Sequence, residues 1–242
     1  MPSGYAYREE GQLQDQIDLY ADAHKGQRLR FSMIGKAAGT LDASDKEALT
    51  SLENEIISFR EHMFLHASHE ENFVHPLLSQ KVPGGANKLN EDHRIMHQQF
   101  DEIAACFGEM KKKPTDFEKL QDLAQEFYLA WNRFTSFYLS HIDYEEEHAM
   151  PTLRKLCTYD ELSDARRKIL GSQDPKSMMY SLEMILPALT PTERFLVLSQ
   201  GLKNVPPEAS QGALKIAERA LSAEDWLLLK KMLKLGETAS DI

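Results

Sequence analysis

The sequence has few of the features that mark β-proteins, membrane proteins or disulfide-bonded proteins. No segment shows sustained alternation of apolar and polar residues, so strands are not expected. No run of about 18 apolar residues occurs, and with a mean hydropathy of −0.48 we expect no contact with a membrane. The two cysteines, Cys106 and Cys157, form neither a disulfide framework nor a CxxC pair. Because the N-terminal residues also do not read as a secretory signal, we expect a soluble cytoplasmic protein.

Positive charge is scarce as well. The 242 residues include 28 Lys and Arg against 38 Asp and Glu, for a net charge of −10. An acidic surface repels phosphate backbones, so nucleic acid is not an expected partner. Residues 1–150 carry a net charge of −11 and all nine histidines, whereas residues 151–242 carry a net charge of +1. Any metal or acid–base chemistry therefore belongs to the first part of the chain.

The first part reads as four long helices. Helix-forming residues in helical patterns are interrupted by turn signals at residues 39–44, 83–85 and 113–115. Two of the helix starts show capping boxes, Ser44 with Glu47 and Thr115 with Glu118. Long helices joined by short loops favour an all-α, up-down-up-down four-helix bundle.

Shorter helices are expected in the C-terminal part. Their predicted ranges are 160–170, 176–186, 191–202, 208–221 and 223–235. Thr190 combines with Pro191 and Glu193 in a strong helix start, and Ser222 resembles another N-cap. We therefore predict a four-helix bundle over residues 1–155 and an appended all-helical region over residues 156–242, which offers no chemical cluster of its own.

One motif occurs twice, in the predicted second and fourth helices. It reads HxxxEExxxxP, from His66 to Pro76 and again, 75 residues later, from His141 to Pro151. Residues four positions apart lie on one helix face, with side chains about 5–6 Å apart. Each HxxxE can therefore offer an imidazole and a carboxylate to one metal ion. The repeat predicts a bundle with two related halves.

Two further histidines, His24 and His93, are expected at the same level of the bundle. In adjacent antiparallel helices, residues at equal depth lie equally far from the connecting loop. The midpoints between His24 and His66, between His66 and His93, and between His93 and His141 fall at residue 45, between residues 79 and 80, and at residue 117. These midpoints lie close to the three predicted loops. The HxxxE of the fourth helix also lies within an aromatic stripe formed by Phe127, Trp131, Phe134 and Tyr138, which we interpret as core.

Buried carboxylates and histidines require compensation. An unpaired buried charge costs several kcal/mol, and few Lys or Arg residues face this layer. Four or five imidazoles with two carboxylates exceed one tetrahedral zinc site and suit two metal ions bridged by the carboxylates, with iron favoured over calcium or magnesium. The ExxH spacing of ferritin-like bundles and the HExxH of zinc proteases are both absent.

These residues resemble the pattern of the hemerythrin-like (HHE cation-binding) family over about residues 10–155. The family pattern places a histidine on the first helix, HxxxE on the second, a histidine or HxxxH on the third, and HxxxE or HxxxxD on the fourth. The matching residues here are His24, His66, Glu70, His93, His97, His141 and Glu145. The resemblance implies two non-haem iron ions with an oxo or hydroxo bridge that handle O2, nitric oxide, peroxide or iron itself.

Two departures from the family pattern leave alternatives open. The fourth helix offers both Glu145 and Glu146 where oxygen carriers have HxxxxD, so the bridging residue and reversible O2 carriage are open. The cysteine-containing domain of relatives that repair iron centres is absent from this sequence, which ranks repair lower. We therefore expect a protein that binds O2 or a related oxidant for sensing, storage or protection, with no catalytic residues assigned. The alternatives are an iron-responsive interaction protein with a partner on its C-terminal helices, and a peroxidase or oxidase.

Several single residues have more than one interpretation. His24 is either a ligand or a hydrogen-bonded core residue, and His97 is either a ligand or a residue that orients one. We expect the other histidines to lie on the surface or to support the ligands: His62, His69, His75 and His148. For Glu71 and Glu146 we expect solvation or hydrogen bonding to a ligand.

Overall fold

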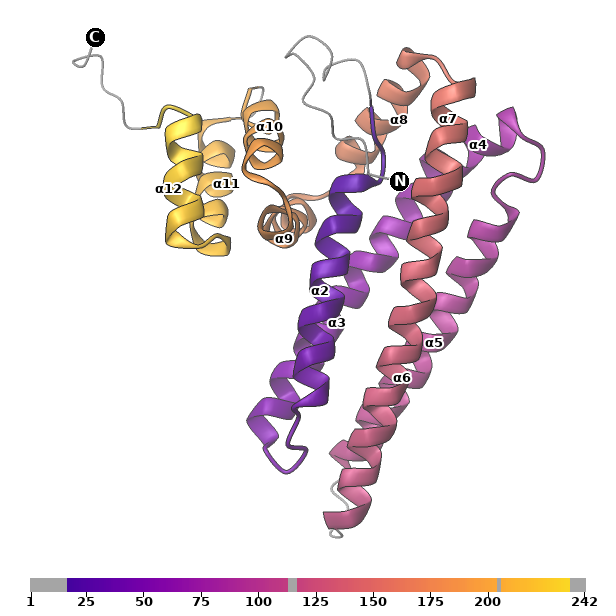
Figure 1. Ribbon diagram of the computed structural model, residues 1–242, viewed down its shortest axis with the longest axis vertical. Coiled ribbons are helices and arrows are strands. Elements are labelled where there is room, and N and C mark those ends of the chain that lie inside the picture. Colours follow the sequence, from indigo (N-terminus) through magenta and orange to yellow (C-terminus); the bar gives the residue numbers. More distant parts are fainter. Residues whose placement is uncertain (1–16, 113–116, 204–205, 236–242) are drawn as a thin grey trace.

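The computed structural model describes residues 17–112, 117–203 and 206–235. Apart from short connections these residues are helical, and they include no β-strand (Figure 1). The all-α prediction is confirmed. Within the same residues, no helix is both long and apolar enough to cross a membrane.

Four long helical segments lie side by side, and each runs opposite to the one before it (Figure 1). Two of them are single α-helices, α2 (Ala21–Gly39) and α5 (Asn87–Lys111). The other two each contain a π-helical turn between two α-helices. Their parts are α3 (Lys46–His69), η1 (Glu70–Val74) and α4 (His75–Lys81), and then α6 (Phe117–Tyr144), η2 (Glu145–Ala149) and α7 (Met150–Leu156). The turns between α2 and α3 and between α4 and α5 therefore lie where the breaker residues predicted, and the third predicted turn, at residues 113–115, lies outside the described residues.

The start of α3 differs in detail from the prediction. Asp45, not Ser44, is the N-cap, and its carboxylate accepts hydrogen bonds from the backbone amides of Glu47 and Ala48. Ser44 instead donates its own amide and hydroxyl to Asp42. Both residue types are good N-caps, so their order along the chain could not decide between them. The predicted capping box at Thr115 lies outside the described residues.

Both π-helical turns begin at the glutamate of the repeated motif and end two residues before its proline. Proline has no N–H, so Pro76 and Pro151 each leave one α-helical hydrogen bond unmade directly after the turn. In a π-helical turn the backbone bonds run from residue i to i+5. Accordingly, the amide of His75 donates to the carbonyl of Glu70. The side chain five positions after each glutamate thus returns to the direction in which the glutamate faces.

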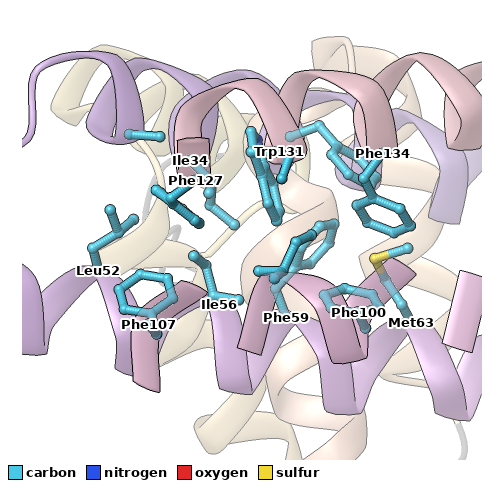
Figure 2. Packing of buried hydrophobic residues seen from close by; sticks show 14 of the residues in the cluster. Ile34, Leu52, Ile56, Phe59, Met63, Phe100, Phe107, Phe127, Trp131 and Phe134 are labelled. Carbon is cyan, nitrogen blue, oxygen red and sulfur yellow. The ribbon is translucent and has the colours of Figure 1, made fainter. Parts of the chain in front are cut away.

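Two apolar clusters enclose the level at which the histidines lie. The larger one is rich in aromatic rings, among them Phe31, Phe59, Trp131 and Phe134, and Figure 2 shows three of these rings interlocked with aliphatic side chains. The smaller one, toward the opposite end of the helices, includes Ile17, Tyr20, Val74, Leu89 and Met150. On each of the four segments, the candidate metal ligands lie between residues of the larger cluster and residues of the smaller cluster. Water is therefore kept away from them at both ends.

The five predicted C-terminal helices are present. They are α8 (Tyr159–Ser172), α9 (Pro175–Ile185), α10 (Pro191–Gly201), α11 (Pro207–Ala220) and α12 (Ala223–Met232), with the 3₁₀ turn η3 (Leu186–Ala188) after α9. Thr190 and Glu193 form the predicted capping box, and Ser222 caps α12. Helices α10 to α12 enclose a small core of their own around Leu198, Ala217 and Leu229.

Helix α9 packs directly on the long helices. Its Met184 is buried in the larger cluster of the bundle. Gly26 on α2 permits the close approach, since a Cβ atom there would lie only 3.1 Å from the Cα of Ile185 and from the carbonyl oxygen of Met184. The appended region therefore meets the bundle at several points: α9 packs on Gly26, two residues from His24, Leu162 of α8 is buried in the smaller cluster, and Glu193 of α10 pairs with Lys25.

Candidate metal centre

The structure brings six of the seven predicted ligands into one buried cluster. They come from all four long segments: His24 from α2, His66 from α3, Glu70 from the start of η1, His93 from α5, His141 from α6 and Glu145 from the start of η2. Their side chains are at most 11% exposed. These residues lie together because they are at equal depth along antiparallel helices, as the loop positions predicted.

Each glutamate of the cluster lies between imidazoles from two helices. The nitrogen–oxygen distances are 2.9 Å from His66 Nε2 to Glu70 Oε1, 3.3 Å from His93 Nε2 to Glu70 Oε2, 3.3 Å from His24 Nε2 to Glu145 Oε2, and 3.5 Å from His141 Nε2 to Glu145 Oε2. The two halves of the bundle therefore contact each other through these side chains. The carboxylate of one half meets the imidazole of the other half as well as its own.

The Nδ1 atoms of three of these imidazoles face outward, toward carboxylates. The distances are 2.9 Å from His24 to Glu146, 2.9 Å from His93 to Glu71, and 3.3 Å from His141 to Asp92. An ionised carboxylate only accepts hydrogen bonds, so Nδ1 carries a proton in each ring, and Nε2, which lies toward the cluster carboxylates, is the nitrogen that can bind a metal ion. Histidines that bind metals are commonly oriented in this way by a hydrogen bond from the other ring nitrogen.

Glu146 is itself held in position. Arg28 Nη1 donates to its Oε1 at 2.7 Å. Burial alone would raise the pKa of Glu146, but the neighbouring His24 and Arg28 outweigh it and lower the pKa to about 2. The carboxylate is thus ionised and available to accept from His24.

Several inner atoms of the cluster have no hydrogen-bond partner among the described residues, although they are fully buried. They are Nε2 of His24 and His66 and both carboxylate oxygens of Glu70 and Glu145. Nε2 of His66 and Oε1 of Glu70 lie 2.9 Å apart, but without the geometry of a hydrogen bond. Buried polar atoms without partners are rare because each costs free energy. Bound metal ions would give these atoms partners.

The electrostatics of the cluster also favour a cation. Burial lowers the pKa of His24, but the carboxylates of Glu145, Glu146 and Glu70 outweigh burial and hold the pKa well above its ordinary value. His93 behaves in the same way: burial lowers its pKa, and Glu70 and Glu71 raise it to about 9. Burial raises the pKa of Glu70, yet the surrounding histidines lower it well below the ordinary value. The glutamates therefore attract positive charge to this point.

His97 is the one predicted ligand that the structure does not bring into the cluster. It lies on the exposed side of α5, and its ring packs on Phe64, with ring centroids 3.9 Å apart.

Of the four histidines expected at the surface or in support, His148 is exposed and stacks on Tyr144. His62 and His69 are instead buried, at 9% and 7% exposed, outside the cluster. Burial lowers the pKa of both, to about 3 for His62, so both rings are neutral.

The sequence placed His75 at the surface or in support of the ligands, but its position in the structure makes it a candidate ligand. It is 3% exposed, and its ring lies against that of His93, with centroids 5.2 Å apart. In an unbroken α-helix a residue five positions after Glu70 would face about 140° away from it, so helical periodicity placed His75 outside the site. The π-helical turn η1 reverses this. The only signal in the sequence was indirect, namely a proline at the same spacing after both glutamates.

The donor atoms form two overlapping groups that could each hold a metal ion. One consists of His24, His66 and Glu70, and the other of Glu70, His75, His93 and Glu145; within each group the donor atoms lie within 4.8 Å of one another. Glu70 belongs to both. Imidazole nitrogens and carboxylate oxygens suit borderline cations such as iron, zinc and manganese, so the residues present fit a metal centre.

Sequence comparisons identify the family. Residues 15–167 match the hemerythrin HHE cation binding domain family, and this match covers more than half of the chain. The protein therefore belongs to the hemerythrin HHE cation-binding family. The family defines a domain that binds metal cations, and the buried His and Glu cluster lies within the matched residues.

Two curated relatives resemble the same part of the chain. F-box/LRR-repeat protein 5 of Xenopus tropicalis is 28% identical over 158 residues, which are 65% of this chain and 23% of that protein. F-box/LRR-repeat protein 5 of Xenopus laevis is 25% identical over 158 residues, 65% of this chain and 22% of that protein. The chain thus spans about a quarter of the length of these relatives. No solved structure matches it significantly.

Proposed function

We propose that this protein is a non-haem di-iron protein that binds O2 or a related small oxidant, such as nitric oxide or peroxide. The observation that carries the proposal is the pair of ligand groups that share Glu70. Two metal ions held by one shared carboxylate form a coupled pair, and Glu145, which lies between His24 and His141, is positioned to be the second bridge. Both glutamates start a π-helical turn at the same level of the hemerythrin-type up-down-up-down bundle.

Iron is the metal that the donor set favours for this role. Calcium and magnesium prefer oxygen ligands alone, and a structural zinc site is usually filled by four ligands. Here at least four imidazoles and two carboxylates serve two positions, a set that leaves room for an oxo or hydroxo bridge and for a small ligand. When bound, such an iron pair supplies reversible redox chemistry and an open coordination position.

The chain's own residues orient the ligands and exclude water. Glu71, Asp92 and Glu146 fix the proton of their histidine partners on Nδ1, so that Nε2 stays available. Tyr20 is a buried residue that can contact a small ligand. The ring of Tyr20 lies 5.3 Å from that of His24, and its buried hydroxyl has no hydrogen-bond partner among the described residues. Burial raises the pKa of Tyr20 well above its ordinary value, so the phenol keeps its proton and can donate it.

The biological role that we propose is sensing, storage or protection in the cytoplasm. Both cysteines are unpaired, which fits a reducing compartment. The larger cluster and the smaller cluster that close the site on either side are apolar, and they admit small neutral molecules more readily than charged substrates.

Reconstitution with ferrous iron tests this proposal. We expect about two irons per chain and, after exposure to air, an oxo-to-iron charge-transfer band. Stopped-flow mixing of the reduced protein with O2, nitric oxide or peroxide then separates the possibilities: reversible binding indicates a carrier or sensor, and repeated turnover indicates a peroxidase or oxidase. His148→Gln, which changes an exposed histidine of η2, is the matched control and should behave as the wild type. Less than one iron per chain would contradict the proposal.

A second candidate function is an iron-responsive interaction protein whose C-terminal helices are the output. Helix α9 contacts α2 and α3 near their candidate ligands. The hydroxyl oxygen of Ser181 lies 3.4 Å from Nδ1 of His62, one turn before His66 on α3. Ile185 packs against Gly26, two residues after His24 on α2. A shift of α2 or α3 on metal binding would therefore reach α9 directly. The F-box and LRR repeats in the names of the two relatives favour a protein partner.

Amide hydrogen exchange with and without iron tests this second candidate. Exchange in α9 and in the α10–α12 unit should slow on iron loading if the region is an output. A change confined to α2 to α7 would contradict it.

A further inference from the structure

Three observations indicate that His75 points into the candidate metal centre. It is 3% exposed, it belongs to the possible ligand group with Glu70, His93 and Glu145, and its ring lies against that of His93. Its Nε2 has no hydrogen-bond partner among the described residues.

The proton of the ring can be placed. His75 Nδ1 lies 2.6 Å from Oδ1 of Asn90 on α5. An amide oxygen only accepts hydrogen bonds, so Nδ1 is the donor, and a neutral ring then keeps its lone pair on the buried Nε2. His24, His93 and His141 have the same arrangement, with a carboxylate in place of the amide. His75 thus has the geometry and the tautomer of a ligand.

The repeat shows that this feature is present on one side only. The motif offset of 75 residues places Met150 at the position equivalent to His75, directly after η2. Met150 is buried in the smaller cluster together with Tyr20. A thioether is a soft ligand and a poor partner for iron among carboxylates. The two metal positions therefore differ, although their histidines and glutamates are related by the repeat.

We propose that His75 is a metal ligand, the third imidazole of the position next to His93 and His141, and that His97 is not a ligand. The position next to His24 and His66 has two imidazoles, with Tyr20 beside His24. This inference rests on the proposed di-iron function and goes beyond the resemblance, which assigned the additional imidazole to His97 of an HxxxH pair on the third helix.

The test compares His75→Ala with His97→Ala in the full chain loaded with iron-57. We expect wild-type protein and His97→Ala to hold about two irons with two distinct Mössbauer doublets, because the two positions have different ligands. In His75→Ala the doublet of one position should shift, and iron affinity should fall by about tenfold to a hundredfold or more. Added imidazole should restore the wild-type spectrum of His75→Ala, because it can occupy the space of the lost ring.

His75→Gln, which keeps most of the volume, covers the case in which the alanine variant does not fold. It should also shift one doublet. A wild-type spectrum in His75→Gln, or a changed spectrum in His97→Ala, would overturn the inference and leave the di-iron function intact. Wild-type protein that holds less than one iron per chain would instead contradict the di-iron function itself.

Discussion

Removal of the outer carboxylates tests how the chain prepares its histidines for metal binding. Glu146 accepts from Nδ1 of His24, and Glu71 accepts from Nδ1 of His93, each at 2.9 Å. In Glu146→Ala the Nδ1–H of His24 has no acceptor, and because His24 is 0% exposed water cannot easily replace it. The proton can then move to Nε2, which prevents metal binding through that atom.

The size of the effect should differ between the two glutamates. Loss of a partner that orients a metal ligand typically lowers metal affinity by about 10- to 100-fold, and each tenfold corresponds to about 1.4 kcal/mol. The side chain of Glu146 is 33% exposed and is also held by Arg28, whereas that of Glu71 is 47% exposed. Water can therefore substitute for Glu71 more readily. We expect metal affinity to fall about 100-fold in Glu146→Ala and about tenfold in Glu71→Ala.

Competition with a chromophoric chelator at fixed pH measures these affinities. Glu147→Ala, which removes the exposed neighbouring carboxylate, is the control for the change in net charge. Glu146→Gln keeps an acceptor oxygen and should lie between the wild type and Glu146→Ala. Equal losses in Glu147→Ala and Glu146→Ala would refute the reasoning, because the effect would then come from overall charge.

Three further predictions concern the scaffold. Gly26→Ala should lower the melting temperature and loosen α9, because its Cβ would lie 3.1 Å from backbone atoms of α9. At Gly108 a Cβ would meet nothing within 4 Å, so Gly108→Ala should instead stabilise α5 by up to about 1 kcal/mol. Phe134→Ala removes a fully buried ring and should cost about 3–5 kcal/mol in urea unfolding; a loss below about 1 kcal/mol would contradict the packing. Arg194→Met loses the ion pair with Asp225 and should speed proteolysis of α12 without changing iron content.

Much of the bundle could be predicted from the sequence because its signals are local. Breaker residues fixed the connections, helical periodicity placed the aromatic stripe of Phe127, Trp131, Phe134 and Tyr138 in the core, and all four residues are buried. Equal distances from the loops brought His24, His66, His93 and His141 to one level. These arguments need only the regular geometry of α-helices.

The remaining features depend on departures from that geometry or on contacts between helices. The position of His75 follows from a π-helical turn, which the periodicity of an α-helix cannot anticipate. His97 is four residues after His93 and lies near the edge of the same face, but the direction of α5 turns it toward Phe64 and solvent. The partners Asp92 and Asn90 depend on how α5 packs against α6 and α4. No pattern in the sequence reports this packing.

Anomalous diffraction at the iron edge, from crystals of the reconstituted protein, tests the central claim most directly. The account predicts two peaks, separated by about 3.5–4 Å as in other two-metal sites, with Glu70 between them. One peak should lie next to His24 and His66, and the other next to His75, His93 and His141. A single peak, or peaks bound by exposed acidic residues outside this cluster, would contradict it.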